Sequence, residues 1–155
     1  MSERPQNLRD TQPVSGERNL ELLRRWIEAF NARDIEAMLA LCDPSIEFHS
    51  VFAAVGGASY RGHDELRRWH RELQEAWGGE IRLEPEVYFD LGERILSFYV
   101  NHARGQHSGA EVAMPAASVV RFRDGLLTYV KAYFHRADAL SDLGLTEDEL
   151  EPIYA

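Results

Sequence analysis

The stretch EVAMPAASVVRFRDGLLTYVKAYF, residues 111–134, decides the fold class of this chain of 155 residues. Its two halves, Glu111–Phe122 and Leu126–Phe134, are rich in the β-branched and aromatic residues that favour strands. Between them stands Asp124–Gly125, a dipeptide that suits the tight turn of a β-hairpin because both residues tolerate a positive φ. The stretch therefore predicts two adjacent antiparallel strands.

Two more strands precede this hairpin, and helices precede the strands. Ile81–Phe89 and Ile95–Ala103 have a similar composition, and the turn residues of Asp90–Gly92 separate them. Further upstream, apolar residues recur at helical spacing in Glu17–Ala32 and in His63–Trp77. Helices followed by a meander of strands predict an α+β fold, with the helices laid on one face of a curved antiparallel sheet.

Shorter signals predict the remaining elements. Asp34 is placed to cap a second helix, which carries Cys42 on its apolar side. Ile46–Ser50 alternates in polarity like a short strand. Near the end of the chain, Thr146 and Glu149 have the spacing of a capping box, which predicts a short acidic helix.

We expect one domain, residues 17–145, between a flexible polar tail at 1–16 and a short acidic helix or tail at 146–155. The first tail lacks the apolar segment of a secretory signal, and no apolar run approaches the roughly 20 residues of a membrane span. The single cysteine, Cys42, cannot form an internal disulfide and is interpreted as a small buried hydrophobe. These features predict a cytoplasmic protein with no membrane partner.

The charge is concentrated at one end of the chain. The whole sequence has 26 Asp and Glu against 17 Lys and Arg, which gives a net charge of −9. Six of these acids and none of the bases lie in residues 138–151, so residues 1–137 carry 20 acids and 17 bases. The negative net charge argues against a nucleic-acid partner. Because the charges of residues 1–137 nearly balance, this part of the chain can enclose an apolar interior.

Five segments form a familiar set in this order: LLRRWIEAFNARD (22–34), DPSIEFHS (43–50), YRGHDELRRW (60–69), AEVAMPAASVVRFRDG (110–125) and YVKAYFHRADALSDLGL (129–145). Over roughly Asn19–Leu145 their order resembles the SnoaL-like branch of the nuclear transport factor 2-like superfamily. The resemblance implies a cystatin-like α+β barrel, a cone-shaped and strongly bent sheet wrapped around the N-terminal helices. It also implies one mostly apolar pocket for a small organic ligand, and a homodimer paired through the outer face of the sheet.

Relatives of this resemblance include ketosteroid isomerases, polyketide cyclases and limonene epoxide hydrolase, alongside proteins that catalyse nothing. The resemblance thus implies two alternatives. One is a cofactor-free lyase, isomerase, cyclase or hydrolase that acts by acid–base chemistry on a cyclic apolar substrate. The other is a non-catalytic ligand-binding or dimerisation module, which the replacement of the family's usual carboxylates favours at Ser118, Ala132 and His135.

Three residues stand at positions resembling catalytic ones in the family. His49 resembles the general base of the isomerases, although the alternation leaves open whether Glu47 and His49 or Phe48 and Ser50 face the pocket. His135 resembles the acid or base of the cyclases. Ser118 resembles an oxyanion-hole donor, although a hydroxyl supplies a hydrogen bond and no acidic proton. On this hypothesis the two histidines exchange the proton and the serine orients the substrate.

Six aromatic or flexible apolar residues are candidates for the wall of the pocket, with packing in the core as the alternative for each. They are Trp26, Tyr60, Trp69, Tyr99, Met114 and Phe134. Trp26 resembles the isomerases' donor Tyr, but an indole N–H cannot act as an acid. The histidines lack the short spacings of a zinc site, so we expect no metal.

Overall fold

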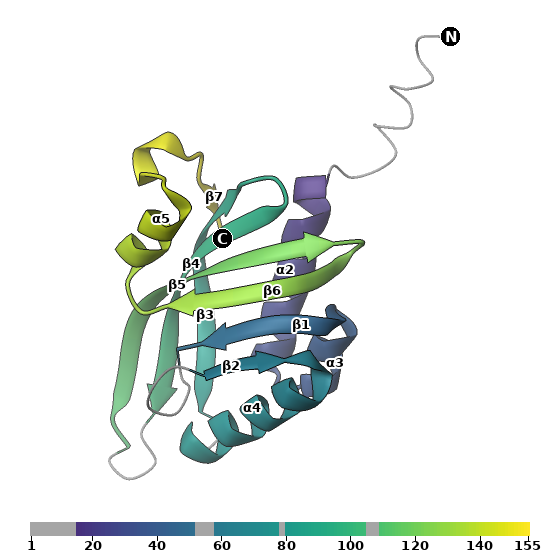
Figure 1. Cartoon of the computed structure of the whole chain (residues 1–155). Coiled ribbons are helices and arrows are strands. Elements are labelled where there is room, and N and C mark those ends of the chain that lie inside the picture. The colour runs from purple at the N-terminus through teal and green to yellow at the C-terminus, as the bar shows by residue number, and fades with distance from the viewer. Residues whose placement is uncertain (1–14, 52–57, 78–79, 105–108) are drawn as a thin grey trace.

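The structure, a computed structural model, describes residues 15–51, 58–77, 80–104 and 109–155. A curled sheet forms its centre, and helices pack on both faces of this sheet (Figure 1). Most of the expected tail at 1–16 lies outside the described residues.

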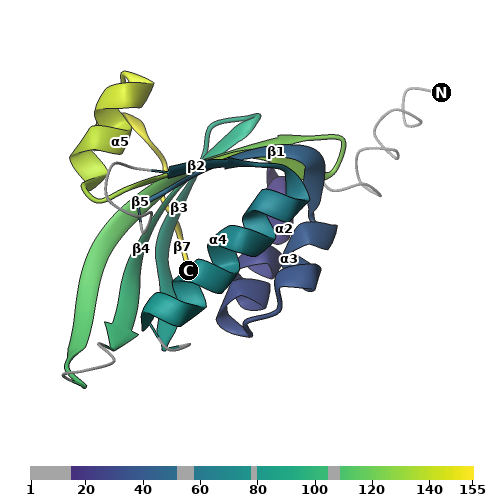
Figure 2. The same cartoon turned by 60° about the horizontal axis from the view of Figure 1, so that its bottom comes forward.

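Three helices lie inside the curl of the sheet: α2 (Ser15–Asn31), α3 (Ile35–Ala40) and α4 (Gly62–Trp77) (Figure 2). The helical spacing of the apolar residues explains this position, because it gives α2 one buried stripe, Leu20, Leu23, Ile27 and Phe30. Asp34 caps α3 as expected, since its carboxylate accepts a hydrogen bond from the backbone N–H of Ala37 at 3.1 Å.

The sheet has seven strands in the order β2-β1-β6-β5-β4-β3-β7. Their bounds are Cys42–Ser50 (β1), Ala58–Arg61 (β2), Ile81–Asp90 (β3), Arg94–Arg104 (β4), Glu111–Arg123 (β5), Leu126–Tyr133 (β6) and Ile153–Tyr154 (β7). Strands β3 to β6 form the expected antiparallel meander, whereas β1 runs parallel to β6. The turn between β5 and β6 has positive φ at Asp124 and Gly125, 54° and 76°, which confirms the hairpin.

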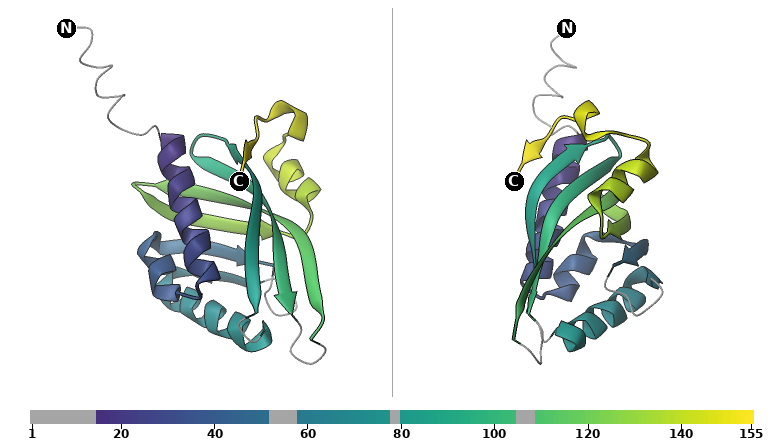
Figure 3. Two further views of the ribbon diagram at one scale, coloured as in Figure 1. Left: turned by 180° about the vertical axis from the view of Figure 1, so that it is seen from behind. Right: turned by 90° about the vertical axis from the view of Figure 1, so that its left-hand side faces the viewer.

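Each face of the meander has its own apolar cluster, because neighbouring residues of a strand point to opposite faces. The inner cluster, beneath α2 and α4, includes Ile95 and Val120. The outer cluster is covered by α5 (Arg136–Leu143), which lies across the sheet from α2 (Figure 3). Its buried members are Phe89, Leu96, Phe98, Ala117, Val119 and Ala139.

The structure corrects the sequence prediction at several elements. Cys42 begins β1 and does not belong to the second helix. The short strands β2 and β7 and the helix α5 were not expected. The capping box of Thr146 and Glu149 is confirmed, although it opens a single 3₁₀ turn. No helix in the described part of the chain is long and apolar enough to cross a membrane.

Candidate functional site

An apolar cavity of about 50 Å³ lies between the inner face of the sheet and the helices. Alternation decides which strand residues reach it: β4 contributes every second residue from Ser97 to Asn101, and β1 contributes Phe48 and Ser50. Its described lining is Leu23, Trp26, Ile27, Phe30, Phe48, Ser50, Val51, Trp69, Leu83, Ser97, Tyr99, Asn101, Ser118, Val120, Val130 and Ala132. Four strands and two helices therefore converge on one small space, with Leu83 added from β3.

Aromatic rings form the helix side of the cavity. Trp69 of α4 packs against Phe48 with ring centroids 4.5 Å apart, and against Phe30 of α2 at 6.0 Å. Trp26 stacks on Phe30 at 6.2 Å. Contacts of this kind fix the rings in place and exclude water, so this wall offers a ligand mainly dispersion and burial of apolar surface.

Most polar groups on the cavity wall already have protein partners. The Trp69 indole N–H donates to Ser50 Oγ at 2.9 Å. The hydroxyls of Ser97 and Ser118, paired across β4 and β5, lie 2.8 Å apart in a hydrogen bond. The Tyr99 hydroxyl donates to the carbonyl of Ala117 at 3.4 Å. Each of these hydroxyls therefore has a hydrogen-bond partner within the protein.

The asparagine on this wall differs from these residues. Asn101 is 1% exposed, and its Oδ1 accepts no hydrogen bond from any described protein group. The Trp26 Nε1 also lacks a hydrogen-bond partner, but its indole lies beside the Cys42 thiol, whose pKa it lowers against the larger, opposite effect of burial. Buried polar atoms of proteins nearly always have partners, so Asn101 is unusual.

The cavity has little capacity for acid–base chemistry near neutral pH. Among the described residues that line it, Tyr99 is the only one with an ionisable side chain, and burial raises the pKa of its hydroxyl well above the ordinary value. A general acid or base works best when its pKa lies near the working pH. The described lining therefore presents hydrogen-bonding and apolar groups.

His49 does not reach the cavity, which corrects its expected role. It lies on the other face of β1 from Phe48 and Ser50, with its Nε2 2.6 Å from Glu47 and its ring 5.5 Å from that of Tyr129. This pairing with His49 holds the pKa of the Glu47 carboxyl below its ordinary value.

His135 is also outside the cavity, at the exposed junction of β6 and α5. It shares a shallow surface hollow with Met114 and Phe134, and Phe134 is 54% exposed. His49 and His135 therefore lie in two separate places outside the cavity, which argues against a proton exchange between them in one pocket. Met114 and Phe134 do not line the cavity either.

Of the other expected residues, Ser118, Trp26, Trp69 and Tyr99 line the cavity. Tyr60 is buried elsewhere, and its hydroxyl donates to Glu72 at 3.3 Å.

The sequence analysis missed two polar residues of the wall, Ser97 and Asn101. The signal that could have found them is the alternation of β4, because Tyr99 was an expected wall residue and its neighbours at i−2 and i+2 point the same way. On β1, where the sequence left two orientations open, Phe48 and Ser50 are the pair that lines the cavity.

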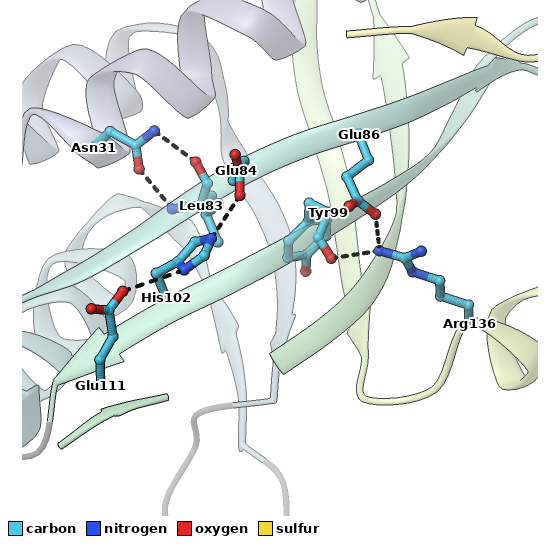
Figure 4. Close-up of polar contacts among 8 residues, drawn as sticks. All are labelled: Asn31, Leu83, Glu84, Glu86, Tyr99, His102, Glu111 and Arg136. Atoms are coloured by element: carbon cyan, nitrogen blue, oxygen red, sulfur yellow. Dashed lines mark hydrogen bonds and ion pairs between the residues drawn. The ribbon is translucent and has the colours of Figure 1, made fainter. Parts of the chain in front are cut away.

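Polar contacts outside the cavity hold its frame, and Figure 4 shows two of them. The side-chain amide of Asn31, at the end of α2, donates to the Leu83 carbonyl at 2.9 Å and accepts from the Leu83 N–H at 2.8 Å. The Arg136 guanidinium donates to the Tyr99 carbonyl at 3.0 Å and to Glu86 at 2.6 Å. Leu83 and Tyr99 both line the cavity, so these contacts fix two of its walls.

Figure 4 also shows His102, which lies 2.7 Å from Glu84 and 3.8 Å from Glu111. Within the described ranges, no group of three or more His, Cys, Asp or Glu side chains is arranged to hold a metal ion.

Comparison with known sequences gives one family. The model of the SnoaL-like domain matches residues 23–130, most of the chain and nearly all of the strands that line the cavity. None of the curated proteins compared with the sequence matches it.

Solved structures share the fold. An NTF2-like protein of unknown function from Burkholderia pseudomallei K96243 is 25% identical, with a TM-score of 0.68 over 80% of this chain and 95% of that chain. TerC, co-crystallised with polyporic acid, is 23% identical, with a TM-score of 0.68 over 81% and 97%. A protein with a ketosteroid isomerase-like fold from Catenulispora acidiphila DSM 44928, in complex with trimethylamine, is 18% identical, with a TM-score of 0.60 over 83% and 95%.

Proposed function

The chain belongs to the family of SnoaL-like domains, and on that premise we propose that it binds a small, mainly apolar organic molecule in the cavity between α2, α4 and the sheet. The observation that carries the proposal is the cavity itself, a partly open space lined by aromatic and aliphatic side chains with few polar groups. Small-molecule sites in proteins have this character. Two structures of similar fold are also crystallised with organic molecules, polyporic acid in one and trimethylamine in the other.

The size of the cavity limits the ligand. Its volume is about 50 Å³, whereas an engineered apolar cavity that binds benzene has about 150 Å³. In this conformation the site suits a molecule of a few heavy atoms. A larger cyclic ligand, such as the sequence hypothesis expected, requires the aromatic wall to move apart.

Binding is a better explanation of this site than acid–base catalysis. The described lining has no carboxylate or imidazole, and the two histidines of the catalytic hypothesis lie outside it. Without such a group a proton transfer at carbon has no acceptor near neutral pH. We therefore favour the ligand-binding module over the isomerase, lyase or cyclase.

The test is a screen of small organic molecules by thermal shift, followed by calorimetry. A true ligand stabilises the native protein by RT ln(1 + [L]/Kd), which is about 2.7 kcal/mol at one hundred times Kd. Ala132→Leu fills the cavity and should abolish this response, while His49→Ala on the outer face should preserve it.

Two results would count against the proposal. A screen without any saturable ligand, or an Ala132→Leu variant that responds like the wild type, would mean that the cavity is not the site. Each ligand should also be recovered after incubation and analysed by NMR. If the ligand is converted to a product, the protein is an enzyme of the cyclase or isomerase type and the binding-module proposal is wrong.

Two expectations from the sequence remain predictions. One is the homodimer, which sedimentation or light scattering of the purified protein would detect. The other is the cytoplasmic location, which fractionation of the source cells would test.

A further inference from the structure

Asn101 is the polar group of the cavity wall that no described protein donor satisfies. It lies on β4, directly across from Leu83 of β3, and its side chain is buried with the rest of the lining. Its carbonyl oxygen, Oδ1, accepts no hydrogen bond from the described protein. An amide oxygen withdrawn from water without a donor is unfavourable, so a binding partner that supplies one gains affinity.

None of the other polar groups at this wall donates a hydrogen bond to Asn101 Oδ1. Ser97 and Ser118 bond to each other, and Tyr99 donates to a backbone carbonyl. The Trp69 N–H donates to Ser50. A molecule bound in the cavity can therefore supply the donor that the described protein does not.

We propose that the ligand of this cavity donates an O–H or N–H hydrogen bond to Asn101 Oδ1. The ligand class is then a small, otherwise apolar molecule with one donor, such as an alcohol, a phenol or an N–H heterocycle. Asn101 is the specificity-determining residue, since the aromatic walls bind hydrocarbon surface without regard to such a donor. This inference rests on the proposed function and names the class of ligand for the same site.

The experiment uses pyrrole and furan as probes. The two rings have nearly the same size and shape, but only pyrrole carries an N–H donor, and five heavy atoms suit a small cavity. Dissociation constants are measured by NMR titration of the full chain. We expect pyrrole to bind about 3- to 10-fold more tightly than furan, the range of one net hydrogen bond.

Two variants isolate the role of Asn101. Asn101→Leu keeps the volume of the side chain and removes the acceptor, so the ratio of the two dissociation constants should fall to about one. Val120→Ala, at an apolar position of the same wall, enlarges the cavity and should change both constants together, leaving the ratio as in the wild type.

The outcomes separate this inference from the proposed function. If furan binds the wild type as tightly as pyrrole, Asn101 does not select a donor and the inference is overturned, while binding in the cavity stands. If neither probe binds the wild type or Val120→Ala, the proposed function fails and the inference fails with it. The wild-type ratio decides the matter even if Asn101→Leu does not fold.

Discussion

Replacing Asn31 by leucine should destabilise the protein, because this side chain completes the edge of a strand. On one side β3 pairs with β4, and on the other it pairs with β7 only at Val87 and Tyr88. At Leu83 the free edge is covered by the Asn31 amide, which binds both the N–H and the carbonyl. Leucine has a similar volume and offers neither a donor nor an acceptor.

The expected cost is about 2–3 kcal/mol. Two hydrogen bonds contribute about 1 kcal/mol each in net terms. Both backbone groups of Leu83 are then left without their partner in a half-buried place, which adds up to about 1 kcal/mol because water reaches them only in part. For a chain of this size the loss corresponds to a decrease in Tm of about 5–10 °C.

The matched control is the same substitution at Asn101, a buried asparagine of the neighbouring strand β4. Asn101→Leu removes an acceptor that has no protein donor, so it should leave stability unchanged or raise it. Both variants are compared with the wild type by urea unfolding followed by circular dichroism, with the midpoint and the slope fitted together. The reasoning is refuted if Asn31→Leu costs less than about 0.5 kcal/mol, or if Asn101→Leu costs as much as Asn31→Leu.

Two further predictions concern groups whose position the structure defines. Burial raises the pKa of the Cys42 thiol to about 12, so little of the reactive thiolate is present at pH 8. A thiol reagent should therefore label the native protein very slowly and the urea-unfolded protein at once. Rapid labelling of the native protein would contradict the buried position of Cys42. His49→Ala and His135→Ala should each leave the pyrrole dissociation constant within about twofold of the wild type, since neither side chain lines the cavity. A tenfold loss of pyrrole affinity in either variant would mean that this histidine contributes to the binding site.

The sequence predicted the architecture well where local chemistry and the global fold agree. The turn at Asp124 and Gly125 could be predicted because a dipeptide with two positive φ angles specifies a hairpin and the strand pairing beside it. The long helices could be predicted for a similar reason, since one apolar stripe defines which face is buried. Strands β2 and β7 are too short to leave such a pattern, and tertiary pairing defines them.

The site was harder to predict, and His49 explains why. The resemblance to isomerases suggested that this residue faces the pocket. Alternation left both orientations open, and the structure has the one in which the apolar Ile46 and Phe48 are buried together. Pairing with β6 fixes this orientation, since Phe48 lies opposite Val130 and both line the cavity. The face that a strand residue occupies thus depended on strand pairing, which the local sequence does not specify.

Helix α5 changes the interpretation of the outer face of the sheet. The family resemblance implied a homodimer paired through that face. In the structure α5 covers much of it: Ala139 is fully buried against a cluster that includes Phe98 and Val119. Arg136 fastens the start of the helix by donating to the carbonyls of Tyr99 and Ala116. The outer cluster is therefore buried within one chain and does not itself require a partner subunit, whereas Phe134 beside the start of the helix stays 54% exposed.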